Sequence, residues 1–182
     1  MDKSKGFTLF ELIIVIAIVG ILATIGTSSF NYVTTSNRIS SEVNSLLGDM
    51  QFARSQAAKT GSNVTVCPAA DASLSSCSGN STWTNGWIVF LDLNGNGVFD
   101  AGSDLVIRKQ RSVSPDTLVS SSAAFKYVVF NREGYASNGL TAWATINLNS
   151  SPVNAQWARC LAVSAVGAMA IEKSGASVPT TC

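Results

Sequence analysis

An apolar run at the start of the chain sets the strongest limit on its fold. Within residues 7–26 the only charged side chain is Glu11. About 20 helical residues at roughly 1.5 Å each match a bilayer hydrocarbon core of about 30 Å. The run therefore predicts a transmembrane helix, and it raises the question of why a carboxylate stands near its beginning.

A removable secretory signal peptide is the alternative interpretation of this run, because Lys3 and Lys5 precede it. However, the run is longer than the usual apolar core of about 7 to 15 residues, and no clean small-x-small cleavage site follows. We therefore favour a helix that is retained. The positive-inside rule then keeps the N-terminus in the cytoplasm and exports the rest of the chain to an oxidising compartment.

Four cysteines in an exported chain favour two disulfides. Three pairings are possible, and the close spacing within each half favours Cys67 with Cys77 and Cys160 with Cys182. The sequence has neither a CxxC motif nor a histidine, so no zinc site is expected. The formal net charge of +1 gives no electrostatic reason to expect a nucleic-acid partner.

The helical pattern continues beyond the apolar run. Apolar side chains recur at intervals of three and four, which indicates one buried stripe, at Ile39, Val43, Leu46, Leu47, Met50, Ala53 and Ala57. Polar side chains such as Glu42 and Asp49 fall mostly outside this stripe. A basic last turn at Lys59 and a glycine stop at Gly61 end the pattern. We expect a helix over residues 7–60, transmembrane over 7–26 and packed on a domain in its second half.

From Gly61 onward, alternating apolar residues separated by clusters of glycine, asparagine and serine predict short strands. The expected strands are residues 64–66, 87–91, 105–107, 125–130, 141–148, 158–163 and 168–172. The spacing of βαβ units is missing, which favours an antiparallel sheet or two packed sheets. The predicted fold class is therefore α+β, with a β-rich domain over residues 61–182.

The segment DLNGNGVFDAGSD raises the question of calcium binding. The first half of an EF-hand loop is matched by Asp92, Asn94, Asn96 and Gly97, with Asp100 at a further ligand spacing. The twelfth position is Ser103 rather than glutamate, and strands rather than helices are expected on both sides. We favour a hairpin connection in which asparagine and aspartate satisfy turn amides, with no metal.

Catalytic interpretations have little support. Without histidine, no Ser-His-Asp or Cys-His arrangement is possible, and the sequence has no G-x-S-x-G elbow or phosphate loop. Asp116 and Glu133 are interpreted as solvated turn residues. The tryptophans occur at strand spacing and are expected in the core rather than on a binding surface: Trp83, Trp87, Trp143 and Trp157. We expect neither an enzyme nor a cofactor.

The stretch GFTLFELIIVIAIVGIL resembles the signal of type IV prepilins and type II secretion pseudopilins. It has the short basic leader, the glycine, an aromatic residue, Thr-Leu, and a glutamate five residues after the cleaved bond. Downstream segments, among them WTNGWIVFLDLNGNGVFDAGSDLVIR and RCLAVSAVGAMAIEK, are similar to the GspH/FimT/FimU group of minor pilins and pseudopilins. The resemblance implies that prepilin peptidase cleaves between Gly6 and Phe7, removes a leader of residues 1–6, and leaves an amine on Phe7 that is then methylated.

The same resemblance implies a role for Glu11. A carboxylate inside a bilayer costs about 2.5 to 3.5 kcal/mol, so such a group is usually retained for a partner. After cleavage the amine of Phe7 is a cation at similar depth, and in a growing filament Glu11 can meet the amine of a neighbouring subunit. The alternative is a carboxylate near the interface that extends to water.

The chain departs from the family pattern in two places. Many type IV pilins have proline where this chain has Ser28, so a bend in this helix would depend on Gly20 or Gly26. DNA-uptake members have an arginine-rich motif after a glycine near the C-terminus, whereas here Gly167 is followed by Ala-Met-Ala. The chain does have a small basic cluster between Asp104 and Asp116, which consists of Arg108, Lys109 and Arg111. We interpret this cluster as a solvated edge. Binding of nucleic acid is not expected.

The resemblance thus implies a noncatalytic minor pilin that helps to initiate or cap a type IV pilus. Its partners would be other minor and major pilins, prepilin peptidase and the inner-membrane assembly platform. It would reside as a single-pass protein in the bacterial inner membrane and then in a pilus or pseudopilus. The alternatives are a type II secretion pseudopilin for protein export, a DNA receptor at the pilus tip, and an anchored calcium-binding domain outside any filament.

Overall fold

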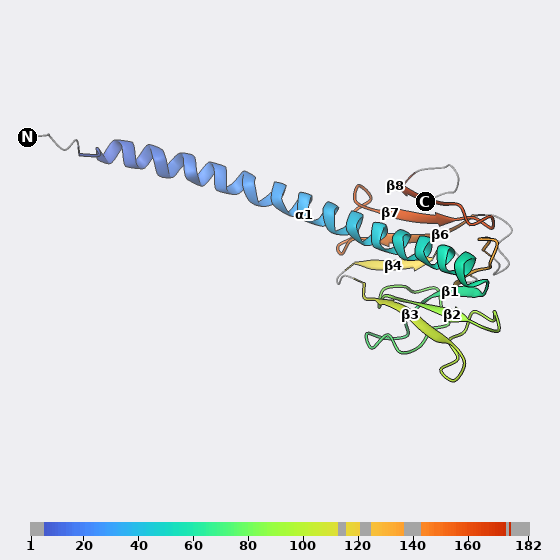
Figure 1. The fold of residues 1–182 in the computed structure, drawn as a ribbon. Helices are drawn as coiled ribbons and strands as arrows, with labels where there is room; N and C mark the ends of the chain where they lie inside the picture. Colours follow the sequence, from blue (N-terminus) through green and yellow to red (C-terminus); the bar gives the residue numbers. More distant parts are fainter. Residues whose placement is uncertain (1–5, 113–115, 121–124, 137–142, 174, 176–182) are drawn as a thin grey trace, which may run out of the picture. The chain divides into compact units, whose positions relative to one another are not determined.

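A computed structural model describes residues 6–112, 116–120, 125–136, 143–173 and 175. One long helix, α1 (Leu9–Thr60), precedes all of the strands (Figure 1). The chain divides into two compact units, Met1–Asn37 and Arg38–Cys182. The second half of α1 therefore belongs to the same unit as the strands, and the two units are described separately.

In the first unit, apolar side chains of α1 are exposed. Leu9, Ile16 and Leu22 are each more than half exposed, and the helix is continuous past Gly20 and Gly26. Of the helical stretches in the described part of the chain, none combines the length and the apolar character that crossing a membrane requires.

In the second unit, the strands form two four-stranded sheets in which every neighbouring pair is antiparallel. The first sheet has the order β3-β2-β1-β5 and consists of β1 (Asn63–Pro68), β2 (Trp87–Asp92), β3 (Leu105–Gln110) and β5 (Val128–Phe130). The second has the order β4-β6-β7-β8 and consists of β4 (Thr117–Ser120), β6 (Ala144–Asn149), β7 (Arg159–Val163) and β8 (Met169–Lys173). The predicted α+β class with two antiparallel sheets is confirmed.

All seven segments predicted as strands contain one, but the pattern missed β4. Its sequence TLVS has only Leu118 and Val119 as apolar residues, which is too short a run to stand out from the surrounding serines. Pairing supplies what the local sequence lacks, because Leu118 lies opposite Leu148 of β6 and is fully buried. Conversely, the strand predicted over residues 125–130 is longer than the observed one, because only its last three residues form β5 (Val128–Phe130).

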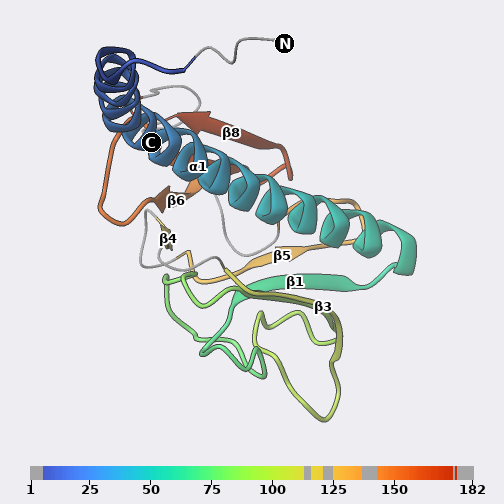
Figure 2. The same cartoon turned by 90° about the vertical axis from the view of Figure 1, so that its left-hand side faces the viewer.

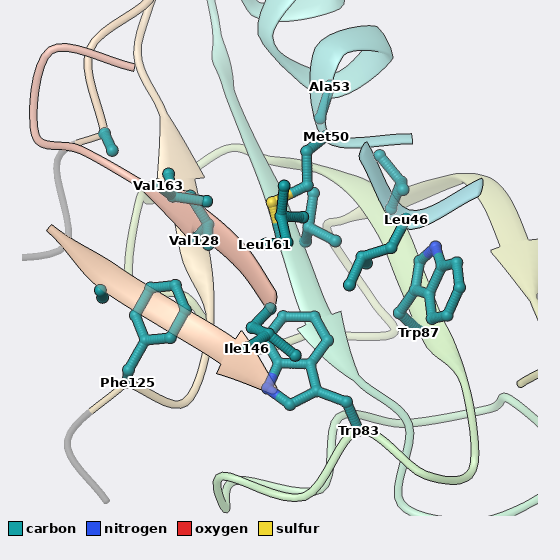
Figure 3. Packing of buried hydrophobic residues seen from close by; sticks show 14 of the residues in the cluster. Leu46, Met50, Ala53, Trp83, Trp87, Phe125, Val128, Ile146, Leu161 and Val163 are labelled. Atoms are coloured by element: carbon teal, nitrogen blue, oxygen red, sulfur yellow. The ribbon is translucent and has the colours of Figure 1, made fainter. Parts of the chain in front are cut away.

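One hydrophobic core joins the helix to both sheets. Figures 1 and 2 show the second half of α1 running along the sheets, and the predicted stripe is confirmed, since every member except the partly buried Leu47 is buried. Met50 from the helix, Trp87 from the first sheet and Leu161 from the second belong to the same cluster (Figure 3).

The tryptophans divide into two groups. Trp83 and Trp87 are buried, as predicted, and Trp83 packs beside Phe125 with a ring-centroid distance of 6.4 Å. Trp143 and Trp157 are only half-buried, so the prediction of four core tryptophans holds for two.

Candidate assembly site

The residues at the N-terminus of α1 form a capping box, in which the N-cap residue and the third helical residue accept hydrogen bonds from each other. The Thr8 hydroxyl accepts a hydrogen bond from the Glu11 backbone amide at 3.2 Å. In return, Glu11 Oε2 accepts hydrogen bonds from the backbone amide and the hydroxyl of Thr8, each at 3.2 Å. Glu11 therefore caps its own helix in the uncleaved chain.

The neighbouring residues place Glu11 beside the predicted cleavage position. Phe7 stands directly before the cap and is 75% exposed. Gly6 is also exposed, and a side chain added there would meet no atom within 4 Å. An amine created at Phe7 would lie at the positive end of the helix dipole, where a cation is disfavoured and a nearby carboxylate is stabilising.

Sequence reasoning missed the capping box, although its signal was available. Threonine followed three residues later by glutamate, directly before an apolar run, is the sequence signature of this motif. The carboxylate thus has a local function in the helix as well as the intermolecular function that the resemblance implies.

In the second unit, some charged side chains are buried in ion pairs, as the pair of Arg38 and Asp116 shows. Arg38 donates from Nε and Nη2 to the two carboxylate oxygens of Asp116, both at 2.7 Å. The Asp116 side chain is fully buried and that of Arg38 is 29% exposed. The hydrogen bond to Asp116 raises the pKa of the Arg38 guanidinium, and burial partly opposes it. The prediction that Asp116 is a solvated turn residue is therefore wrong, because the helix brings a cation to it.

Two further acidic residues of α1 that were expected on the polar face are buried as well. Asp49 accepts a hydrogen bond from the Trp87 indole at 2.8 Å and from Arg108 at 2.6 Å. Arg108 also lies over the Phe52 ring, 3.9 Å from its centroid, a cation–π contact. Glu42 accepts a hydrogen bond from the Ser112 hydroxyl. These groups fix the helix to the first sheet and to the chain that follows β3.

This arrangement changes the interpretation of the basic cluster. Arg108 pairs with Asp49 and lies over the Phe52 ring, while its side chain stays 45% exposed. Lys109 and Arg111 are exposed, as expected. All three cations of the cluster are thus exposed, and one of them, Arg108, is already paired with an acidic residue.

The segment of residues 92–104 forms the hydrogen-bonded turn that the sequence favoured. Asp92 is fully buried, and its carboxylate accepts hydrogen bonds from the Thr65 hydroxyl and the amides of Gly95, Asn96 and Gly97. Asp100 accepts from two asparagine side chains, and Asp104 accepts from the amides of Leu93 and Asp100. These hydrogen bonds order the turn. No group of three His, Cys, Asp or Glu side chains suited to a metal occurs in the described residues.

One predicted disulfide is present. Cys67 and Cys77 are joined across ten residues, with their Cα atoms 5.7 Å apart. Cys160 is buried and disulfide-bonded. Its predicted partner, Cys182, lies outside the described residues, so that pairing stays a prediction, which peptide mapping under nonreducing conditions tests.

The fold is that of a pilin-like chain, a long N-terminal helix with a two-sheet domain, and comparisons with known families agree. A model described as type II transport protein GspH matches residues 42–167, and one described as prokaryotic N-terminal methylation motif matches residues 1–27. The chain therefore belongs to the GspH family and carries the N-terminal methylation motif. No curated protein matches it.

Two crystal structures of the type IV minor pilin FimU from Pseudomonas aeruginosa are similar to this chain. One has a TM-score of 0.55 at 19% identity and covers 79% of this chain and 99% of its own. The other has a TM-score of 0.58 at 19% identity, with coverages of 80% and 96%. At this identity the similarity establishes the fold, and it confirms the predicted resemblance to minor pilins at that level.

Proposed function

We propose that this chain is a noncatalytic minor pilin that helps to initiate or cap a type IV pilus. Prepilin peptidase cleaves it between Gly6 and Phe7, and the new amine is methylated. Before assembly, residues 7–26 hold it in the inner membrane with its N-terminus in the cytoplasm. Its partners are other minor and major pilins, the peptidase and the inner-membrane assembly platform.

The observation that carries this proposal is the placement of Glu11. It is the only charge within residues 7–37, it stands one turn from Phe7, and it lies in the segment matched by the N-terminal methylation motif. The surrounding apolar side chains are exposed, so the helix offers a surface that a neighbouring helix can cover. An apolar surface with one carboxylate selects a partner that presents one cation.

Two measurements test processing and assembly separately. Intact mass of the mature chain should correspond to loss of residues 1–6 with one methyl group on Phe7. The mature chain should then appear in filaments sheared from the cell surface. A chain that keeps its first six residues in a strain with active peptidase would contradict the proposal.

The second candidate is a pseudopilin of a type II secretion system, which is favoured by the match to the GspH family model. Both candidates use the same helix and the same cleavage, so the fold does not separate them. A deletion scored together for surface pili, secreted proteins and DNA uptake does separate them. Loss of secretion with normal piliation would favour the pseudopilin, and selective loss of DNA uptake would favour a receptor.

A further inference from the structure

A small cavity lies beside the disulfide in the second unit. It has a volume of about 270 Å³ and is lined by Cys67, Cys77, Gly97, Val98, Lys126 and Tyr127, among others. Two loops and the residues just before β5 meet there. Val98 is 53% exposed, so the cavity opens to solvent.

The walls of this cavity are held in place by the fold. The disulfide fixes one wall. Another part of the lining is Asn96 and Gly97, whose amides donate to the buried carboxylate of Asp92. Gly97 has a φ of +75°, and a Cβ there would lie 2.3 Å from the Tyr127 ring, so the ring packs on bare backbone. A preformed site loses little entropy on binding.

The chemistry of the lining selects the ligand. The lining includes the exposed Val98, the half-buried Tyr127 and the half-buried Cys77, which favour an aromatic side chain through ring–ring and sulfur–aromatic contacts. Lys126 is the only charged lining residue. Lys126 is exposed, and none of the ion pairs among the described residues includes it.

The cavity lies at the small end of the range of about 300 to 1,000 Å³ that drug-sized ligands occupy, and its volume of about 270 Å³ has room for one aromatic side chain. We propose that it binds a phenylalanine side chain of a partner polypeptide, with an adjacent carboxylate of that polypeptide paired to Lys126. This site stands apart from the filament function proposed above, because no residue of α1 lines it.

The test uses the full chain in detergent micelles, labelled with ¹⁵N, and three short probes. Acetyl-Phe-Glu-amide should shift the amides of Gly79, Gly97, Val98 and Lys126 saturably, with a dissociation constant in the millimolar range expected for one anchored side chain. Acetyl-Ala-Glu-amide lacks the ring and acetyl-Phe-Lys-amide reverses the charge. Each should bind at least about fivefold more weakly, since loss of roughly 1 kcal/mol corresponds to that factor.

Two exposed positions provide variants that keep the fold. Lys126→Glu should reverse the preference between the Phe-Glu and Phe-Lys probes. Val98→Asp should abolish the response, whereas Val153→Asp, at an exposed valine outside the lining, should not.

Three outcomes would overturn the proposal. These are equal responses to the Phe-Glu and Ala-Glu probes, an unchanged spectrum of the folded protein at millimolar probe, and the same amides shifting with protein concentration alone. The last would mean that a second copy of this chain occupies the cavity. The readout involves no filament, so failure here leaves the proposed function standing.

Discussion

The charged side chains in the two halves of α1 differ in the partners that they bind. Within residues 7–37 a single carboxylate, that of Glu11, stands among exposed apolar side chains, and the contacts that the structure describes for it are to Thr8 in its own cap. From Arg38 onward, four charged residues of the helix, Arg38, Glu42, Asp49 and Arg54, are bound by groups far away in the same chain. A charge that finds a distant partner within the chain serves folding. For a charge that is surrounded by exposed apolar surface, as Glu11 is, we propose a role in association.

This difference has a physical basis in desolvation. Asp116 is fully buried and Asp49 nearly so, and such groups are tolerated because hydrogen bonds and ion pairs replace water. Glu11 is exposed in the isolated chain and becomes desolvated only when other apolar surface covers it. Its energetic effect should therefore appear in assembly and not in the stability of the domain.

The largest expected effect concerns processing of the first half. Gly6→Leu should block removal of residues 1–6 completely, because a peptidase must approach backbone without a Cβ at the cleaved bond. The chain itself has room for this side chain, since no atom lies within 4 Å, so the block should not come from misfolding. Intact mass decides the result, with Gly6→Ala as the smaller matched change. Full cleavage of Gly6→Leu would remove the basis for assigning this bond.

Arg38→Ala should give the largest effect on the second half. It leaves Asp116 buried without its cation, which should lower the free energy of unfolding by about 3 kcal/mol. Denaturant unfolding of the full chain in detergent measures this. The double variant Arg38→Ala, Asp116→Ala should be more stable than the single Arg38→Ala, because no orphaned charge remains. If the double variant is the less stable of the two, burial of Asp116 is not the cause.

Asp49→Ala should cost about 2 kcal/mol, since the buried Trp87 indole would lose its acceptor. Asp49→Asn keeps an oxygen for the indole at that position and loses only the charge that Arg108 binds. We expect Asn to be about half as destabilising as Ala in the same unfolding experiment. Equal losses for the two variants would show that the hydrogen bond to Trp87 contributes nothing.

The smallest effect is expected at an exposed turn. Hydrogen bonding from the Ser73 side chain and backbone lowers the pKa of Asp71 below its ordinary value. A lowered folded-state pKa contributes stability above the unfolded pKa, and this contribution is lost as pH falls through the folded value. Following the Ser73 amide by NMR during acid titration should give a midpoint below about 3.9, the ordinary value for aspartate. In Asp71→Asn this transition should vanish, and a midpoint above about 4 would contradict the shift.

Periodic features of the fold could be predicted from the sequence. The helical stripe from Ile39 to Ala57 and the strands around Val66, Phe90 and Leu161 repeat at spacings that burial dictates. The Cys67–Cys77 bridge followed from the short spacing between its cysteines. In each case the relevant information lies within a few residues of the chain.

Pairings between distant residues could not be predicted in this way. From the sequence alone, Asp116 is interpreted as a turn residue. In the fold it binds Arg38 of α1, which is 78 positions away in the chain. From the sequence alone, Asp49 is interpreted as a solvated helix residue, but in the fold it binds Trp87 and Arg108. Likewise, β4 is recognisable as a strand through its pairing with β6. Tertiary contacts override local pattern at these sites.

We propose that Glu11 acts between subunits, whereas Arg38 acts within one subunit. The most direct test compares the share of each mature chain in sheared filaments for Glu11→Gln and Thr8→Ala, normalised to the cleaved chain in the membrane. Glu11→Gln keeps an oxygen for the cap but loses the charge, whereas Thr8→Ala weakens the cap and keeps the charge.

We predict that Glu11→Gln lowers incorporation at least tenfold. The amine of Phe7 in the neighbouring subunit would lose its carboxylate partner, and an unpaired charge in apolar surroundings costs about 2.5 to 3.5 kcal/mol. Each 1.4 kcal/mol corresponds to a factor of ten. Thr8→Ala should stay within about twofold of the unaltered chain, and neither variant should change the unfolding midpoint of the domain. Normal incorporation of Glu11→Gln together with a loss for Thr8→Ala would show that this carboxylate serves only its own helix.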